Sequence, residues 1–316
     1  MTTNYDLLTF GPVPSRRLGQ SLGINNIPPK ICSYSCVYCQ AGKTLRMQIE
    51  REAFYKPEEI LKAVEKKIRD AKDKGERIDY LTFVPDGEPT LDINLGKEIE
   101  LLKPLGIKIA VISNASLVWQ KDVLEDLCKA EWVSLKIDAV SEDVWYKINR
   151  PHKPLEFEKI LQGIIEFSHT FKAELATETM LIQDINDTVE EIRKIANFIV
   201  GLKDVKSYIS IPTRPPAEKW VNSATEHTIN TAYQLFKEKS IDAEYLIGYE
   251  GNAFAFTGNV EEDLLSITSV HPMREEAVDE FLKKAKASRE VVQKLLNENK
   301  LIETEYKENK FYVRKI

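Results

Sequence analysis

Short apolar runs alternate with longer amphipathic segments through the middle of the chain. Several of the runs are continuously apolar or β-branched, as is typical of strands covered on both faces of a sheet. Strands that alternate with helices in this way indicate repeated β–α units and a parallel sheet. The sequence therefore predicts an α/β fold. The runs predicted as strands are 21–27, 80–84, 108–112, 132–137, 174–181, 208–211 and 243–246.

Amphipathic segments separate these runs. In the first of them Ile60, Leu61, Val64 and Ile68 recur at helical spacing, and Pro57 suits a first helical turn. The segments predicted as helices are 57–74, 94–102, 121–129, 157–171, 189–200 and 228–237. About six β–α units indicate a partial (β/α)6-type TIM barrel rather than a complete eightfold one. In such folds reactive groups lie at the carboxyl ends of the strands.

The pattern changes after residue 258. Two helical segments, 274–285 and 289–297, precede two alternating segments, 301–306 and 310–315, that flank a turn. Helix, helix and hairpin in this order resemble a small winged-helix module. We therefore predict two domains, a core at 1–258 and a winged-helix-like C-terminal module at 259–316.

Composition limits the functional classes. The 316 residues are 43% hydrophobic, enough for a large core, and the net charge of −6 argues against a broad nucleic-acid-coating surface. No stretch reaches the roughly eighteen consecutive apolar residues of a membrane span. The first residues are neither basic nor apolar enough for export, so we expect a cytoplasmic protein without a membrane partner.

Three of the four cysteines stand together near the start of the chain, as Cys32, Cys36 and Cys39. Gaps of three and two residues let one short loop present three sulfurs to an iron–sulfur cluster. A cubane has four irons, so three protein ligands leave one iron open to a small molecule. The fourth cysteine, Cys128, lies in a predicted amphipathic helix and reads as a small buried residue.

Two other readings of the three cysteines exist. A structural zinc site is one, but zinc usually takes four ligands from two separated pairs, and the nearest histidine in sequence is His152. A disulfide is the other, but three clustered cysteines cannot all pair. Few cysteines without paired spacing also fit a reducing compartment.

The loop Cys-x3-Cys-x2-Cys, with Tyr38 before its last cysteine, resembles the cluster loop of the radical S-adenosylmethionine (SAM) superfamily. The resemblance implies a radical SAM core domain with a [4Fe–4S] cluster held by Cys32, Cys36 and Cys39. It also implies that SAM chelates the open iron and is cleaved to a 5′-deoxyadenosyl radical. An electron donor such as flavodoxin or ferredoxin would supply the electron. No catalytic residue is identified.

A turn after the second predicted strand carries Gly87, Glu88 and Pro89. It resembles the Gly-Glu-Pro segment with which the superfamily grips the methionyl ammonium of SAM. Glycine at that bend lets the backbone approach a ligand. Taken alone, Asp86-Gly87 is only a turn signal.

Polar residues at the ends of later strands are further candidates for SAM contacts. Ser113 and Asn114 carry a hydroxyl and an amide, although both residue types also form turns and helix caps. Lys136 and Asp138 alternate with apolar neighbours on the fourth strand, where the alternative is a mutual ion pair. Glu178 on the fifth strand is a weaker candidate, because a buried hydrogen bond explains it equally well. The resemblance adds Tyr38 to this set.

Two arginine motifs, at 14–19 and 212–218, complete a resemblance to the branch of the superfamily grouped with wyosine synthase, which rebuilds a guanine in transfer RNA. The chain has no cysteine before Cys32, so we expect no second cluster of the kind that wyosine synthases hold, and their pyruvate chemistry is not carried over. The favoured substrate is transfer RNA or another nucleic-acid component. Two alternatives remain: an iron–sulfur redox or iron sensor with a DNA-binding C-terminal module, and a zinc-stabilised binding protein.

Overall fold

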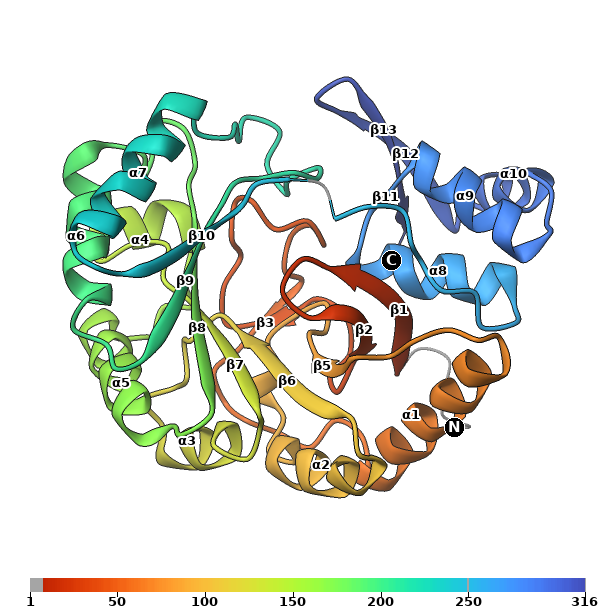
Figure 1. Ribbon diagram of the computed structural model, residues 1–316, viewed down its shortest axis with the longest axis horizontal. Helices are drawn as coiled ribbons and strands as arrows, with labels where there is room; N and C mark the ends of the chain where they lie inside the picture. The colour runs from red at the N-terminus through yellow and green to blue at the C-terminus, as the bar shows by residue number, and fades with distance from the viewer. Residues whose placement is uncertain (1–7, 249, 316) are drawn as a thin grey trace. The chain divides into compact units, whose positions relative to one another are not determined.

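The computed structural model describes residues 8–248 and 250–315, and its principal sheet has eight strands in the order β1-β2-β5-β6-β7-β8-β9-β10 (Figure 1). Parallel pairing joins β2 to β5 and joins β6, β7, β8, β9 and β10 in succession. This mostly parallel sheet confirms the predicted α/β class. The strands are β1 (Thr9–Ser15), β2 (Gly19–Ile24), β5 (Tyr80–Phe83), β6 (Lys108–Ser113), β7 (Trp132–Lys136), β8 (Glu174–Met180), β9 (Val205–Ser210) and β10 (Asp242–Leu246).

All seven predicted strands are present, and β1 was not predicted. It pairs antiparallel with β2 at one end of the strand order, with a register irregularity between Phe10 and Val13. Its sequence contains Pro12 and Pro14, which lack the backbone N–H of a ladder donor. Proline is tolerated in an edge strand, where one side of the ladder needs no partner.

The six predicted helices are also present, and two further helices were missed. The confirmed helices are α1 (Pro57–Asp73), α2 (Leu95–Leu102), α3 (Lys121–Leu127), α5 (Phe157–Thr170), α6 (Val189–Ile199) and α7 (Glu226–Glu238). The helices that were missed are α4 (Glu142–Asn149) and α8 (Val260–Val270). α1 starts on Pro57, and Gly75 follows its end with a left-handed φ of 72°.

The chain separates into two compact units. The second unit, residues 30–52 and 110–249, contains all four cysteines and strands β7 to β10. Figure 1 shows α5, α6 and α7 along one side of β8, β9 and β10. Their apolar positions, such as Ile164 and Ile195, are buried. The helices therefore cover one face of these strands, as parallel strands require.

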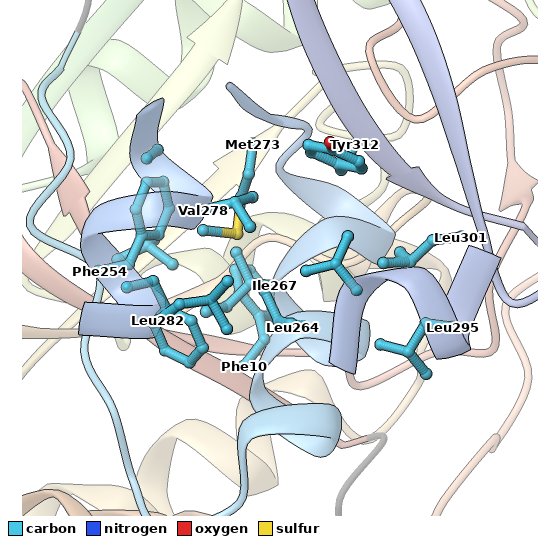
Figure 2. Packing of buried hydrophobic residues seen from close by; sticks show 14 of the residues in the cluster. Phe10, Phe254, Leu264, Ile267, Met273, Val278, Leu282, Leu295, Leu301 and Tyr312 are labelled. Atoms are coloured by element: carbon cyan, nitrogen blue, oxygen red, sulfur yellow. The ribbon is translucent and has the colours of Figure 1, made fainter. Parts of the chain in front are cut away.

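The first unit comprises residues 1–29, 53–109 and 250–316. One of its hydrophobic clusters combines Phe10 and Val13 of β1 with apolar residues of the C-terminal segment (Figure 2). That segment contains α9 (Glu275–Ala285), α10 (Glu290–Asn297) and a small sheet in the order β11 (Met273–Arg274), β13 (Asn309–Arg314) and β12 (Leu301–Tyr306). These helices and the hairpin lie where they were predicted. The boundary at residue 258 and the winged-helix assignment stay predictions.

Within residues 8–248 and 250–315, no helix has the length and apolar character that crossing a membrane requires. The cytoplasmic location stays a prediction.

Phe281 of α9 tests the cluster of Figure 2. Its side chain is 1% exposed, and its ring meets the ring of Phe256 edge-on. Phe281→Ala should lower the free energy of unfolding by about 3–5 kcal/mol, because it leaves a cavity in a packed core. The matched control is Ile302→Ala on β12, where the side chain is 41% exposed and the loss should stay below about 1 kcal/mol. Denaturant titration measures both, and equal losses would contradict the prediction.

Candidate cluster and cofactor site

The three cysteines lie on one irregular segment of the second unit. Cys32 ends the short strand β3 (Ile31–Cys32), which pairs with β4 (Arg46–Met47), and Cys36 and Cys39 follow in the loop. The backbone N–H of Cys39 donates to the carbonyl of Cys36 at 3.1 Å. All three cysteines carry thiols that are partly buried. The loop therefore presents three sulfurs over a short length of chain.

Two of these sulfurs accept hydrogen bonds from side-chain amides. Asn114 Nδ2 lies 3.4 Å from Cys32 Sγ, and Asn149 Nδ2 lies 3.4 Å from Cys36 Sγ. Hydrogen bonds to the sulfurs are among the features that set the potential of an iron–sulfur cluster. This donor set, three thiols with amide N–H groups beside them, fits a cluster held through Cys32, Cys36 and Cys39.

The protonation of the thiols also matters. Burial and the nearby Asp138 raise the pKa of Cys36 to about 12, so its thiol keeps its proton at neutral pH. Ligation of iron by Cys36 would therefore release that proton. In the part of the chain that the structure describes, no three Cys, His, Asp or Glu side chains are grouped as ligands of a single metal ion. Cubane ligands bind different irons, so the sulfurs need not converge on one point.

Ser113 and Asn114 form a turn at the end of β6. Ser113 Oγ accepts from the N–H of Ala115 at 3.0 Å, and Asn114 Oδ1 accepts from the N–H of Ser116 at 2.9 Å. Asn114 Nδ2 also donates to Ser33 Oγ at 2.9 Å. Both residues therefore have the turn role that was the alternative at sequence level. The same turn places the Asn114 amide against Cys32.

Lys136, at the end of β7, pairs with Glu178 and not with Asp138. Its Nζ lies 2.7 Å from Glu178 Oε1 and 5.1 Å from the centre of the Tyr38 ring. Glu178 also accepts from Ser210 Oγ at 3.0 Å. The Lys136 and Glu178 side chains are 17% and 8% exposed, so the ion pair is largely removed from water. The expected alternative, a mutual pair of Lys136 with Asp138, is wrong.

Asp138 instead accepts hydrogen bonds from three different residues. Its Oδ2 accepts from the Tyr38 hydroxyl and from Asn149 Nδ2, the latter at 2.9 Å. Its Oδ1 accepts from the N–H of Met180 at 2.9 Å. Burial and the charge of Asp138 raise the pKa of Tyr38, which keeps the phenol protonated as the donor of its bond. Lys136 and Asp138 thus both lie against Tyr38 of the cysteine loop.

The Gly87 turn belongs to the first unit and has its own internal bonds. The Glu88 carboxylate accepts from the N–H of Thr90 at 3.1 Å and from its hydroxyl at 2.6 Å. It thereby caps the 3₁₀ turn Pro89–Leu91. Asn26 Nδ2 donates to the carbonyl of Pro89 at 3.1 Å. These bonds give the turn a defined shape, and its role in binding SAM stays a prediction.

Sequence reasoning missed Asn149, the donor to Cys36. It is the last residue of α4, a helix that was not predicted. A signal for the helix exists, because Ser141 precedes Val144, Trp145 and Ile148 at helical spacing. No local signal indicates that the helix ends beside a cysteine, since the contact joins residues 113 positions apart.

Comparison with known proteins agrees with the resemblance of the cysteine loop. Residues 26–199 match the model of the radical SAM superfamily, and the chain belongs to that superfamily. The UPF0026 protein MJ1312 of Methanocaldococcus jannaschii is 50% identical over 311 residues, which cover 98% of this chain and 96% of the relative. The chain is accordingly an enzyme of the radical SAM class, whose members bind a [4Fe–4S] cluster and SAM.

Two solved structures share the fold. A radical SAM methyltransferase from Sphaerobacter thermophilus aligns with a TM-score of 0.59 at 15% identity, over 72% of this chain and 66% of its own. The wyosine synthase TYW1, solved with a lysine-pyruvate adduct bound, aligns with a TM-score of 0.52 at 19% identity. The alignment covers 69% of this chain and 73% of the TYW1 chain. At these identities the likeness establishes the partial-barrel fold and not a shared substrate.

The Lys136–Glu178 pair offers a test of the site's packing. Lys136→Met leaves the Glu178 carboxylate buried without its cation, which should lower the free energy of unfolding by about 3–5 kcal/mol. The measurement is denaturant unfolding of protein free of iron and SAM, so that ligand binding does not contribute.

The control for this prediction is Lys147→Met on α4. Lys147 lies 3.5 Å from Asp143, and the two side chains are 65% and 72% exposed. Loss of such a pair should change the free energy of unfolding by less than about 1 kcal/mol. A Lys136→Met protein as stable as the control protein would show that the buried pair does not stabilise the site.

Proposed function

We propose that Cys32, Cys36 and Cys39 ligate a single [4Fe–4S] cluster with one open iron, and that the protein cleaves SAM reductively there. The observation that supports this proposal is the set of sulfurs: three partly buried thiols lie on one loop, and two of them accept hydrogen bonds from side-chain amides at 3.4 Å. A fully ligated cluster would transfer electrons only, whereas a cluster with an open iron can bind a small molecule.

When bound, the cluster supplies one electron that cleaves SAM to methionine and a 5′-deoxyadenosyl radical, which abstracts hydrogen from a substrate. The chain's own residues would position the cluster and SAM and exclude competing reactions. We assign SAM contacts to Gly87, Glu88 and Pro89 from their resemblance. In the second unit we assign SAM contacts to Asn114 and Lys136. The Asn114 amide contacts Cys32 and the Lys136 ammonium lies over the Tyr38 ring, so both groups are near the cysteine loop.

The alternatives are weaker on chemical grounds. A sensor with a DNA-binding module needs no SAM, and a zinc-stabilised binding protein needs four converging ligands. Membership of the radical SAM superfamily favours catalysis over both. Metal analysis after anaerobic purification separates zinc from iron directly.

Substitution of one cysteine tests the cluster ligands. After anaerobic reconstitution, Cys36→Ser should lose most bound iron and sulfide and should form no 5′-deoxyadenosine from SAM with dithionite, because a hydroxyl is a poor ligand for this cluster. Cys128→Ser is the control, since Cys128 follows α3 outside the loop. Wild-type levels of 5′-deoxyadenosine from the Cys36→Ser protein would contradict the proposed ligation of the cluster.

Transfer RNA or another nucleic-acid component remains the favoured substrate. One observation supports an anionic substrate near the site: Arg214 donates to Gln40 Oε1 at 2.7 Å, next to Cys39 in the chain. Arginine suits phosphate recognition. The C-terminal segment adds less support, because Lys294 pairs with Glu261 at 2.6 Å and Lys310 lies 3.6 Å from Glu303.

Binding of unfractionated transfer RNA tests this substrate class. We expect association measured by fluorescence anisotropy to weaken as salt rises, because phosphate contacts release counterions. Arg214→Ala should reduce the affinity and flatten the salt dependence. The control is Arg193→Ala on α6, an exposed arginine. Association that is absent, or that does not respond to salt, would count against a nucleic-acid substrate.

A further inference from the structure

Asp138 is linked to the cysteine loop directly through Tyr38 and indirectly through Asn149 of α4. The Tyr38 hydroxyl, one residue before Cys39, donates to its Oδ2. Asn149 Nδ2 donates to the same oxygen at 2.9 Å and to Cys36 Sγ at 3.4 Å. An amide nitrogen carries two hydrogens, so Asn149 can make both bonds at once. A continuous chain of hydrogen bonds therefore runs from the Cys36 sulfur through Asn149 and Asp138 to Tyr38.

From this chain of hydrogen bonds we infer that Asp138 and Asn149 are positioning residues for the cysteine loop. Asn149 also raises the reduction potential of the cluster. Asp138 does not contact SAM. The inference rests on the proposed ligation by the three cysteines. It replaces the sequence-based prediction that Asp138 binds the cofactor.

The Asp138 carboxylate is already occupied by protein donors. It is 3% exposed, and three donors share its two oxygens. Its backbone is fixed as well, because Asn186 Nδ2 donates at 2.8 Å both to the Asp138 carbonyl and to the Met180 carbonyl. The three protein donors fill three of the carboxylate's roughly four acceptor sites, and the side chain is almost entirely buried, so it offers SAM at most one acceptor site.

Asn149 is held in a way that suits a fixed donor. It is 3% exposed, and its carbonyl accepts from the N–H of Ser35 at 3.0 Å. The carbonyl of Ile148 accepts from the N–H of Val37 at 2.9 Å. The end of α4 thus binds the loop backbone on both sides of Cys36, and the amide side chain binds the sulfur between them.

The bond to Cys36 has a redox consequence. Reduction of a cluster adds negative charge that is shared by its sulfurs, so a hydrogen bond to a sulfur stabilises the reduced state more than the oxidised state. Removing the donor should therefore make the cluster harder to reduce. Because only the difference in bond strength between the two redox states counts, we expect the reduction equilibrium to fall by about tenfold.

Asn149→Leu tests the redox part, because leucine has a similar size and no N–H. In reconstituted protein with full iron content, the midpoint potential should become more negative by about 59 mV, the equivalent of tenfold for one electron. The control is Thr177→Val, which removes the buried 2.9 Å bond between Thr177 and Ser207 and should leave the potential unchanged. An unchanged potential in a fully loaded Asn149→Leu protein overturns the redox part.

Tyr38→Phe and Asp138→Asn test the positioning part. Tyr38→Phe removes one bond to Asp138, and Asp138→Asn replaces one acceptor oxygen by a donor. Both variants should lose iron to a chelator several times faster than the wild type, and Asp138→Asn should bind SAM with unchanged affinity. Weakened SAM binding with a wild-type rate of iron loss overturns the inference. A wild-type protein that takes up no iron contradicts the proposed function itself.

Discussion

The buried carboxylate of Asp138 is the constraint on which the site of the second unit depends. The cysteine loop has little regular structure of its own, and a loop with three sulfurs can adopt many shapes. The bond from Tyr38 to the carboxylate reduces this freedom directly, and Asn149, which bonds both to the carboxylate and to Cys36, reduces it at a second place. The carboxylate also accepts a hydrogen bond from the backbone of Met180, the last residue of β8. The loop is therefore connected through Asp138 to the sheet. A partly satisfied network of this kind would be costly, which explains why each oxygen has partners.

Parallel pairing explains how these residues meet. The carboxyl ends of β6, β7, β8 and β9 lie along one edge of the second unit, and each carries a polar residue that the site uses. Asn114 follows β6, Lys136 ends β7, and Ser210 ends β9. Glu178 lies near the end of β8 and accepts bonds from the last two. One sheet edge therefore collects side chains from distant parts of the chain, as is typical of this fold class.

Local sequence was enough for some of the site and not for the rest. The spacing of the cysteines indicates a cluster loop, and the ends of predicted strands indicate Asn114, Lys136 and Asp138. The partners of these residues were not predictable, as Lys136 illustrates. The alternation of polar and apolar residues along one strand suggested Asp138, two residues away, as the ion-pair partner of Lys136. The observed partner is Glu178 on the neighbouring strand. Register between strands decides such pairs, and register depends on packing over the whole sheet.

The sequence by itself determined the α/β class, most helices and strands, and the chemistry of the three thiols, because periodicity and spacing are local properties. It did not reveal β1, whose prolines hide a strand, or the contact of β1 with the C-terminal segment in one core. Tertiary structure alone decided that α4 ends beside Cys36 and that Asp138 faces Tyr38. These contacts join residues about a hundred positions apart, and only the collapse of helices onto a common sheet brings them within hydrogen-bonding distance.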